Sequence, residues 1–327
     1  MLAIDIGTSE ITILRDGEVV LREPSVIAVD VENRKKITLG AEAKKMMGRS
    51  PEYIEVLEPI RSGVIVDYEA AKLMLKGYLQ QVMGNNWFIG PEVVTAVPSG
   101  NTQVEQRAVM DATLSAGAKR AYLIDEPLAA AIGAKIPVAE AAGNMIVDIG
   151  GGAAEAAVIA LGGVVTHKGV RMGGNKLDVS IREFLRKRHN LIIVEQTAEN
   201  IKITIGSATK LKRPEMMQVN GRDSIFGLPK AIELSSDDVY EALKETLTAI
   251  LTMIRETLEV TPPELVADIA DRGIVLSGGT SQLRNFNKLV TSEIGVAAHI
   301  APEPQFCVIK GVGAAIENLE VYRRAIR

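Results

Sequence analysis

Two short glycine-rich stretches carry the residue types from which a phosphate site can be built. The first runs from Asp5 to Ser9 (DIGTS) and the second from Asp148 to Gly152 (DIGGG). Each follows a short apolar run and precedes another, which predicts a strand, a glycine turn and a returning strand. Glycines let backbone N–H groups approach a phosphate, and a carboxylate at the strand end suits a hydrated Mg²⁺. One such hairpin is a weak signal, but two indicate a nucleotide held between two related domains.

Composition and charge narrow the class of protein. With 327 residues the chain has room for two or more domains, each large enough to bury a core. Hydrophobic residues make up 47% of the chain and aromatic residues only 4%, a balance that favours aliphatic α/β sheets covered by helices. The net charge of −4 argues against broad binding to nucleic acid.

Two further features indicate the compartment. Cys307 is the single cysteine, so an intramolecular disulfide is excluded and a reducing cytoplasm is expected. No apolar run approaches the roughly 18 residues that span a bilayer, and no secretory leader is expected before the first strand. We therefore expect a cytoplasmic protein, with room for a peripheral contact with a membrane.

The elements that must hold the first glycine turn alternate between strand and helix. Asp16-Gly17 predicts a tight turn between the second and third strands. Asp67 predicts the N-cap of a helix, because apolar residues recur at helical spacing after it. A strand, a helix and a strand are then expected over 93–97, 104–116 and 121–124. This alternation is typical of an α/β sheet.

The second half repeats the plan around the second glycine turn. A hairpin is expected over 145–166, and a helix is expected to begin in 178–187. A long helix is expected over 239–258, and Pro262-Pro263 prevents it from continuing. An apolar run then leads into a third glycine turn.

Several motifs, in one order along the chain, resemble the MreB family of bacterial actin homologues. They are EPSV (23–26), GVIVDY (63–68), VPSG (97–100), EPLAAAIGA (126–134), TAE (197–199), IKI (201–203) and TPPEL (261–265). This family shares the actin-type ATPase fold with actin, DnaK-type chaperones and sugar kinases. The motifs cover nearly the whole chain, so the resemblance is specific, whereas any lone Gly-Gly would be an ordinary turn.

The resemblance implies an α/β protein with a duplicated actin-like ATPase fold, in which two domains flank a nucleotide cleft and each carries a small inserted subdomain. The first domain, IA, would comprise residues 1–31, 63–142 and 303–327, with the insertion IB at 32–62. The second domain, IIA, would comprise residues 143–178 and 239–302, with the insertion IIB at 179–238.

The resemblance also implies that the cleft binds ATP and Mg²⁺. Asp5 and Asp148 would hold the Mg²⁺ through water. Glu199 and Lys202, three apart on one helix face, match positions that contact adenine and ribose; without the resemblance they would be read as a surface ion pair. The remaining nucleotide contacts would be Gly7, Thr8 and Ser9 in the first phosphate loop, Gly150, Gly151 and Gly152 in the second, the backbone at Gly174, and Gly278, Gly279 and Thr280 at the adenosine.

Glu126 is the candidate catalytic residue. It matches a family glutamate that positions the water attacking the γ-phosphate, and this in-line attack needs little else besides Mg²⁺ and backbone donors. Without the resemblance, Glu126 is an acid at a helix N-terminus, stabilised by the helix dipole and followed by Pro127. Both interpretations can hold together.

Three departures from the family's pattern point to slow hydrolysis. Ala153-Ala154 stand where the family usually has Thr-Thr, so a hydroxyl that helps to hold the attacking water is missing. Glu10 and Ile11 replace Asn-Thr, and an acid there repels a polyphosphate unless strand alternation turns it away. Asn175 replaces a usual Asp. Loss of one water-positioning hydrogen bond costs on the order of 10²-fold in rate, so we predict nucleotide binding with slow or negligible hydrolysis.

A membrane contact is expected at Trp87, Phe88 and Ile89, which turn-forming residues flank on a connection. Trp and Phe favour the headgroup region of a bilayer. The alternative is a loop that folds back to fill the core. The resemblance favours the first interpretation, because proteins of this family carry a short hydrophobic loop here that inserts into the inner leaflet.

The leading interpretation of function is a filament-forming cytoskeletal protein. ATP would close the cleft and favour head-to-tail association, which does not close into a ring. The resemblance implies paired protofilaments on the inner face of the cell membrane, where they organise cell shape and cell-wall synthesis with cell-wall elongation proteins. The sequence itself shows no filament contact.

Two alternatives stay open. Ala153-Ala154 fits a hydrolysis-deficient scaffold that binds nucleotide and co-assembles with an active paralogue. A small-metabolite kinase of the same fold is less favoured. It would need a general-base Asp where Glu126 stands, and usually longer insertions.

Overall fold

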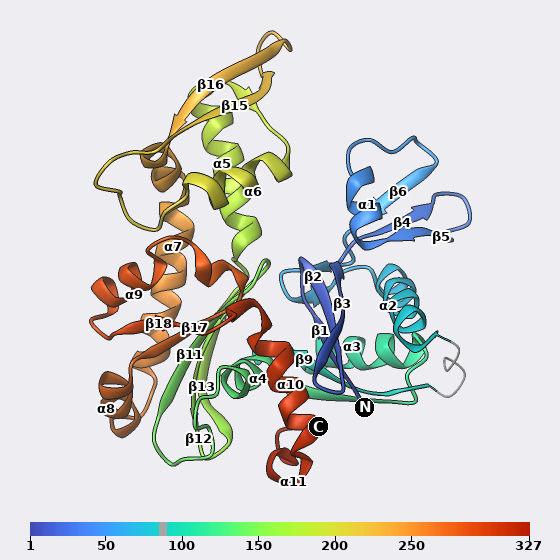
Figure 1. Ribbon diagram of the computed structural model, residues 1–327, viewed down its shortest axis with the longest axis vertical. Coiled ribbons are helices and arrows are strands. Elements are labelled where there is room, and N and C mark those ends of the chain that lie inside the picture. The colour runs from blue at the N-terminus through green and yellow to red at the C-terminus, as the bar shows by residue number, and fades with distance from the viewer. Residues whose placement is uncertain (85–89) are drawn as a thin grey trace.

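The computed structural model describes residues 1–84 and 90–327 and has two lobes, each built on a five-stranded sheet (Figure 1). The expected membrane residues Trp87, Phe88 and Ile89 lie outside the described residues. In the first lobe the strand order is β10-β9-β1-β2-β3. The strands are β1 (Leu2–Ile6), β2 (Glu10–Arg15), β3 (Glu18–Pro24), β9 (Glu92–Val97) and β10 (Arg120–Asp125).

The second sheet repeats this plan with the order β13-β12-β11-β17-β18. Its strands are β11 (Asn144–Ile149), β12 (Ala154–Ala160), β13 (Gly163–Val170), β17 (Ile274–Ser277) and β18 (Ala298–Ile300). In each sheet three antiparallel strands come first in the chain, and two parallel strands follow on the side of the first strand. The repeated order confirms the predicted duplication of an α/β fold.

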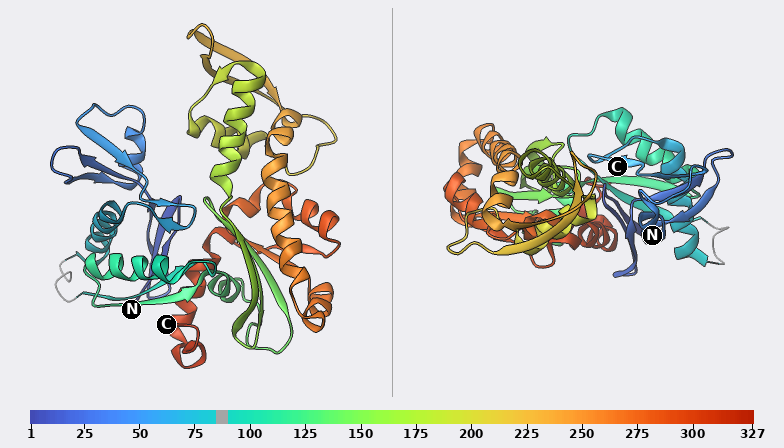
Figure 2. Two further views of the ribbon diagram at one scale, coloured as in Figure 1. Left: turned by 180° about the vertical axis from the view of Figure 1, so that it is seen from behind. Right: turned by 90° about the horizontal axis from the view of Figure 1, so that it is seen from above.

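Helices cover the sheets and fill the space between them (Figures 1 and 2). The covering helices are α2 (Tyr68–Met83) and α3 (Gln103–Ser115) in the first lobe, and α5 (Gly174–His189), α7 (Ser236–Glu259), α8 (Pro263–Arg272) and α9 (Phe286–Ile294) in the second. Between the sheets lie α4 (Glu126–Gly133) and α10 (Cys307–Glu317), in one hydrophobic cluster that includes Val94 and Ile146. A Cβ on Gly311 would lie 1.7 Å from the Ala129 carbonyl oxygen, so these two helices pack closely only because glycine stands there.

Each lobe also carries a small three-stranded sheet, and the two small sheets lie at the same end of the molecule (Figure 1). One contains β4 (Ile27–Asp30), β5 (Lys36–Leu39) and β6 (Ile54–Leu57) beside α1 (Gly40–Met46). The other contains β14 (Leu191–Ile192), β15 (Met216–Asp223) and β16 (Pro229–Ser235) beside α6 (Glu195–Ile205). The remaining short elements are β7 (Ile60–Arg61), β8 (Val64–Ile65), α11 (Leu319–Tyr322) and the 3-10 helices η2 (Gly279–Gln282) and η3 (Pro304–Phe306). The domain boundaries given above stay a prediction.

Local signals explain where several elements begin and end. The β2–β3 turn contains Asp16 and Gly17 at φ angles of 52° and 80°, as the tight turn requires. Asp67 caps α2 as predicted, because its carboxylate accepts the N–H of the third helical residue. α7 begins at Ser236, before the predicted 239, since Ser235 and Asp238 form a capping box.

None of the helices in the described ranges combines the length and the apolar character needed to cross a membrane.

Candidate functional site

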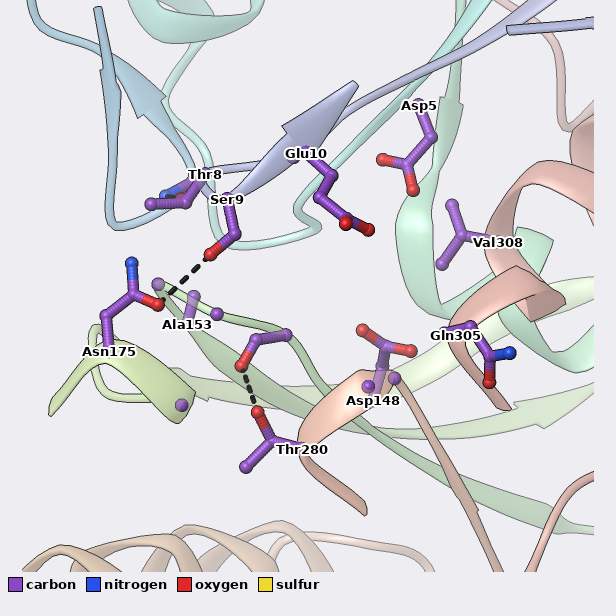
Figure 3. Close-up of a pocket in the computed structure, with 18 of the residues that line it drawn as sticks. Asp5, Thr8, Ser9, Glu10, Asp148, Ala153, Asn175, Thr280, Gln305 and Val308 are labelled. Atoms are coloured by element: carbon purple, nitrogen blue, oxygen red, sulfur yellow. Dashed lines mark hydrogen bonds between the residues drawn. The ribbon is translucent and has the colours of Figure 1, made fainter. Parts of the chain in front are cut away.

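A cavity of about 450 Å³ lies between the two lobes, where the first two glycine turns meet (Figure 3). Every residue predicted to contact nucleotide, Mg²⁺ or the attacking water lines it: Asp5, Gly7, Thr8, Ser9, Glu126, Asp148, Gly150, Gly151, Gly152, Gly174, Glu199, Lys202, Gly278, Gly279 and Thr280. The fold therefore brings the predicted site together from both lobes. The role of each residue toward a ligand stays a prediction.

The two phosphate loops touch across this cavity. A Cβ on Gly151 would lie 2.0 Å from Ser9 Oγ, and a Cβ on Gly152 would lie 2.3 Å from Thr8 Oγ1. The Gly63 N–H donates to the same Thr8 hydroxyl at 2.9 Å, which fixes its position. Glycine is needed at positions 151 and 152 because a side chain there would collide with the first loop.

The N-terminus of α5 lies against the second loop. The Gly174 N–H donates to the Gly150 carbonyl at 3.0 Å, and the Asn175 N–H donates to the Gly151 carbonyl at 2.8 Å. Ser9 Oγ donates to Asn175 Oδ1 at 3.0 Å (Figure 3). The Asn175 amide therefore joins the two lobes, and the positive end of the α5 dipole favours an anion beside it.

Two aspartates, Asp5 on β1 and Asp148 on β11, line the cavity. Burial, and then the charge of Asp148, raises the pKa of Asp5 to about 7, and Glu10 adds a smaller effect. Burial also raises the pKa of Asp148 to about 6, although Ser277 Oγ, which donates to it at 2.6 Å, acts in the opposite direction. Both acids are therefore placed where a positive charge would stabilise their ionised forms.

Two glutamates, Glu126 and Glu155, also line the cavity. Glu126 is the first residue of α4, and burial, followed by the charges of the neighbouring acids, raises its pKa well above the ordinary value. Glu155 lies on β12 directly across from Asp148 and is 8% exposed. Its two oxygens accept the N–H groups of Ser99 and Gly100, each at 3.2 Å, so it joins the second lobe to the first. Burial raises its pKa to about 7.

Sequence reasoning missed Glu155. The sequence did contain a signal, because a single acid inside the apolar run 153–159 indicates a buried carboxylate with hydrogen-bond partners. Its partners in the 98–100 loop lie 55 or more residues away, and only the fold brings them together.

Among the sequence departures, Ala153 and Glu10 line the cavity, whereas Ala154 does not. Ala153 lines the cavity, whereas Ala154 is 1% exposed and belongs to the core of the second lobe. Glu10 does not turn away from the site, because β2 begins with it on the cavity side (Figure 3). Its carboxylate accepts a hydrogen bond from Arg22 Nε at 2.9 Å.

Helix α6 also lines the cavity and presents Glu199 and Lys202 on one face as predicted. Lys202 Nζ donates to Asp178 Oδ2 at 2.7 Å and to the Gly174 carbonyl at 3.1 Å. Glu199 instead faces Lys44 at 4.0 Å, across the gap to the small sheet of the first lobe. The two residues thus serve separate contacts and are not a surface ion pair with each other.

The charges of the cavity fit a cation together with a polyphosphate. Six acids line it (Asp5, Glu10, Glu126, Asp148, Glu155 and Glu199) against three bases (Arg22, Lys44 and Lys202). Each base already faces an acid. Within residues 1–84 and 90–327 no group of three or more His, Cys, Asp or Glu side chains could hold a metal ion. The donor set therefore fits a hydrated Mg²⁺ whose remaining ligands are water or phosphate oxygens.

Known proteins match this chain over nearly its whole length. Residues 1–324 match the family described as MreB/Mbl protein. The chain is 42% identical over 327 residues to the cell shape-determining protein MreB of Escherichia coli strain K12, covering 98% of this chain and 94% of that protein. It is 38% identical over 320 residues to the cell shape-determining protein Mbl of Bacillus subtilis strain 168, covering 98% and 96%.

Solved structures agree with the sequence matches. MreB5 of Spiroplasma citri bound to ADP superposes with a TM-score of 0.92 at 33% identity, covering 99% of this chain and 98% of that one. The same protein bound to AMPPNP gives 0.90 at 32% identity, covering 99% and 97%. The MamK double helical filament gives 0.81 at 20% identity, covering 97% and 98%, a likeness that shows the fold alone. Fold, cavity and sequence together show that this chain belongs to the MreB/Mbl family of actin-like proteins.

Proposed function

We propose that this protein binds ATP between its two lobes and assembles into cytoskeletal filaments that organise cell shape. The observation that carries the proposal is the cavity in which two glycine turns and the acids of both lobes meet. Two observations on relatives support it. The matched E. coli and B. subtilis proteins are named as cell shape-determining, and the matched MreB5 structures hold ADP and AMPPNP.

Different residues of the cavity would contact the phosphates, the adenosine and the Mg²⁺. The backbone of the two phosphate loops would receive the polyphosphate, and Glu199 and Lys202 would contact the adenosine. Asp5 and Asp148 would hold a hydrated Mg²⁺, which when bound would offset part of the negative charge that the six acids place in the cavity. Glu126 would orient the attacking water from the start of α4.

Hydrolysis is proposed to be slow. Ala153 lines the cavity where a threonine hydroxyl would help Glu126 to hold water, and an alanine methyl group cannot donate or accept. The same observation favours a second candidate function, a hydrolysis-deficient scaffold that co-assembles with an active paralogue. Phosphate release alone and after mixing with that paralogue separates the two.

An exposed apolar tip supports self-association. Ile225 and Phe226, between β15 and β16, are 66% and 77% exposed, and nearby Leu228 is 64% exposed. Asp223 accepts the N–H groups of both Ile225 and Phe226 and pairs with Lys230, so the tip is held in shape. Apolar side chains gathered at the end of an elongated molecule are suited to a protein–protein contact, here with a second copy in a head-to-tail protofilament. Pairing of protofilaments is part of the same proposal.

The membrane contact is proposed from the sequence. Trp87, Phe88 and Ile89 would insert into the inner leaflet, placing the filaments on the cytoplasmic face of the cell membrane beside cell-wall elongation proteins. Replacing Trp87 and Phe88 together by alanine is expected to abolish co-sedimentation with liposomes. Unchanged binding would remove this part of the proposal.

Electron microscopy of the purified protein with ATP and lipid tests the whole proposal. Filaments lying on the lipid surface are expected with ATP, and few or none without nucleotide. Light scattering and phosphate release, measured with ATP in the absence of sugars, exclude the kinase alternative if assembly proceeds. A protein that stays monomeric with ATP and hydrolyses it only when a small metabolite is added would refute the proposal.

A further inference from the structure

An arginine stands at the phosphate end of the cavity, outside every motif that the resemblance identified. Arg22 lies on β3 and lines the cavity. Its guanidinium donates to Glu10 through Nε at 2.9 Å and lies 2.7 Å from the same carboxylate through Nη2. Glu10 directly follows Ser9 of the first phosphate loop, so the pair adjoins the place where the phosphates are expected.

The backbone explains why these two side chains meet. Glu10 lies across from Pro24 in the β2–β3 register, and Arg22 lies across from Thr12. Glu10 and Arg22 are therefore diagonal neighbours on one face of the sheet, within reach of long side chains. On its other side the guanidinium lies 5.0 Å from the centre of the Phe306 ring, a cation–π contact that limits its freedom.

The other two bases of the cavity face residues outside the first phosphate loop. Lys202 is held by Asp178 and the Gly174 carbonyl, and Lys44 on α1 lies 4.0 Å from Glu199 on α6. Among the described residues that line the cavity, Arg22 is thus the cation that adjoins the first phosphate loop. Its side chain is 42% exposed and that of Glu10 is 45% exposed, so the pair is weak enough to exchange for a stronger partner.

We propose that Arg22 is a further recognition residue of the nucleotide site, which contacts the terminal phosphate of a nucleoside triphosphate. Glu10 and Phe306 hold its guanidinium in place while the site is empty. A triphosphate offers more negative charge and bidentate oxygens than one carboxylate, so the guanidinium transfers from Glu10 to the phosphate. This inference rests on the proposed nucleotide binding and adds to it a residue that separates triphosphate from diphosphate.

Calorimetric titration of AMPPNP and of ADP, both with Mg²⁺, tests the proposal on the wild-type chain, four single-site variants and one double variant. Arg22→Gln is expected to weaken AMPPNP binding by about tenfold or more and ADP binding by clearly less. Arg22→Lys should keep part of the difference. Glu10→Gln should tighten AMPPNP binding, because it removes both a repelling charge and the competing partner. Arg15→Gln is the matched control, since Arg15 lies on β2 and pairs with Asp16 at 3.4 Å outside the cavity.

The double variant Glu10→Gln with Arg22→Gln decides between contact and simple charge balance. If Arg22 contacts the phosphate, the double variant binds AMPPNP more weakly than the wild-type chain, although the two carry the same net charge. The proposal would be overturned if the double variant bound AMPPNP as tightly as the wild-type chain. It would also be overturned if Arg22→Gln reduced the affinities for AMPPNP and ADP equally. Thermal melts without nucleotide verify that each variant folds. A wild-type chain that binds neither nucleotide would instead defeat the proposed function itself.

Discussion

The two phosphate hairpins have the same backbone plan but place their acids differently. In β1–β2, Asp5 lies across from Thr12, and the residue that leaves the loop is Glu10. In β11–β12, Asp148 lies across from Glu155, and the residue that leaves the loop is Ala153. In the first hairpin the acid after the loop, Glu10, is half-exposed beside Arg22. The second hairpin has Ala153 at that position and a buried acid, Glu155, two residues further along.

This difference separates two tasks that the duplicated fold performs together. The first hairpin holds an ion pair at the cavity, which is suited to recognising a charged ligand. The second holds a buried carboxylate against the 98–100 loop of the other lobe and presents the methyl group of Ala153 to the cavity. Both hairpins therefore support the proposed binding, and the methyl group of Ala153 in the second is the basis of the proposed slow turnover.

The largest effect is expected from Gly152→Val, a change in the second hairpin that acts on the first. A Cβ there lies 2.3 Å from Thr8 Oγ1 and would force the two loops apart, so nucleotide affinity should fall on the order of 100-fold. The control is Gly163→Val at the start of β13, where a Cβ meets nothing within 4 Å. Calorimetric titration with AMPPNP and Mg²⁺ measures both, and near-equal affinities would show that the loops do not need to touch.

The second hairpin can also be given the missing group. Ala153→Thr places a hydroxyl at the cavity and should raise the rate of phosphate release roughly tenfold. Ala154→Thr is the paired control, because its side chain lies in the core, where a hydroxyl should cost about 1–3 kcal/mol of stability without a gain in rate. Release rates that stay the same in Ala153→Thr would show that something other than this methyl group limits hydrolysis.

The pH dependence of stability should reveal the acids that the two hairpins share. Asp5, Asp148 and Glu155 have raised pKa values in the folded state, so the folded chain retains protons that the unfolded chain has lost between about pH 4 and pH 7. Stability without Mg²⁺ and nucleotide should therefore decrease as the pH rises from 5 to 7.5, with a fall in Tm on the order of 5 °C.

Glu155 lies across from Asp148 as Thr12 lies across from Asp5, so variants at these two positions sharpen the expectation. Glu155→Gln removes one of the acids and should reduce the fall in Tm, whereas Thr12→Val should leave it unchanged. Mg²⁺ with ADP should raise Tm more at pH 7.5 than at pH 5, because the acids are then ionised. A Tm that rises with pH in the ion-free protein would contradict the assignment of these acids as buried and unneutralised.

Local features of the fold were accessible from the sequence. The two glycine hairpins, the Asp16-Gly17 turn and the Asp67 cap follow from residue types over a few positions, and the structure contains each of them. The resemblance further predicted the duplication and part of the set of residues that line the cavity. Boundaries set by less obvious caps, such as that of α7, were displaced by a few residues.

Contacts between segments that are distant in the chain could not be predicted from the sequence. The interpretation of Glu10 left its direction open, since alternation along a strand does not say which face meets the cavity. Glu155, Arg22 and Asn175 acquire their roles only through partners on other strands or in the other lobe. Register and lobe packing are properties of the whole chain, and a single sequence does not display them.

The nucleotide held in assembled protein tests the central claim, binding without rapid turnover, most directly. Polymer formed with ATP and Mg²⁺ would be collected by sedimentation and its bound nucleotide separated by chromatography. We predict that most chains in the pellet carry nucleotide and that it is mainly ATP. A pellet that contains mainly ADP would contradict slow turnover, and one that contains no nucleotide would contradict binding.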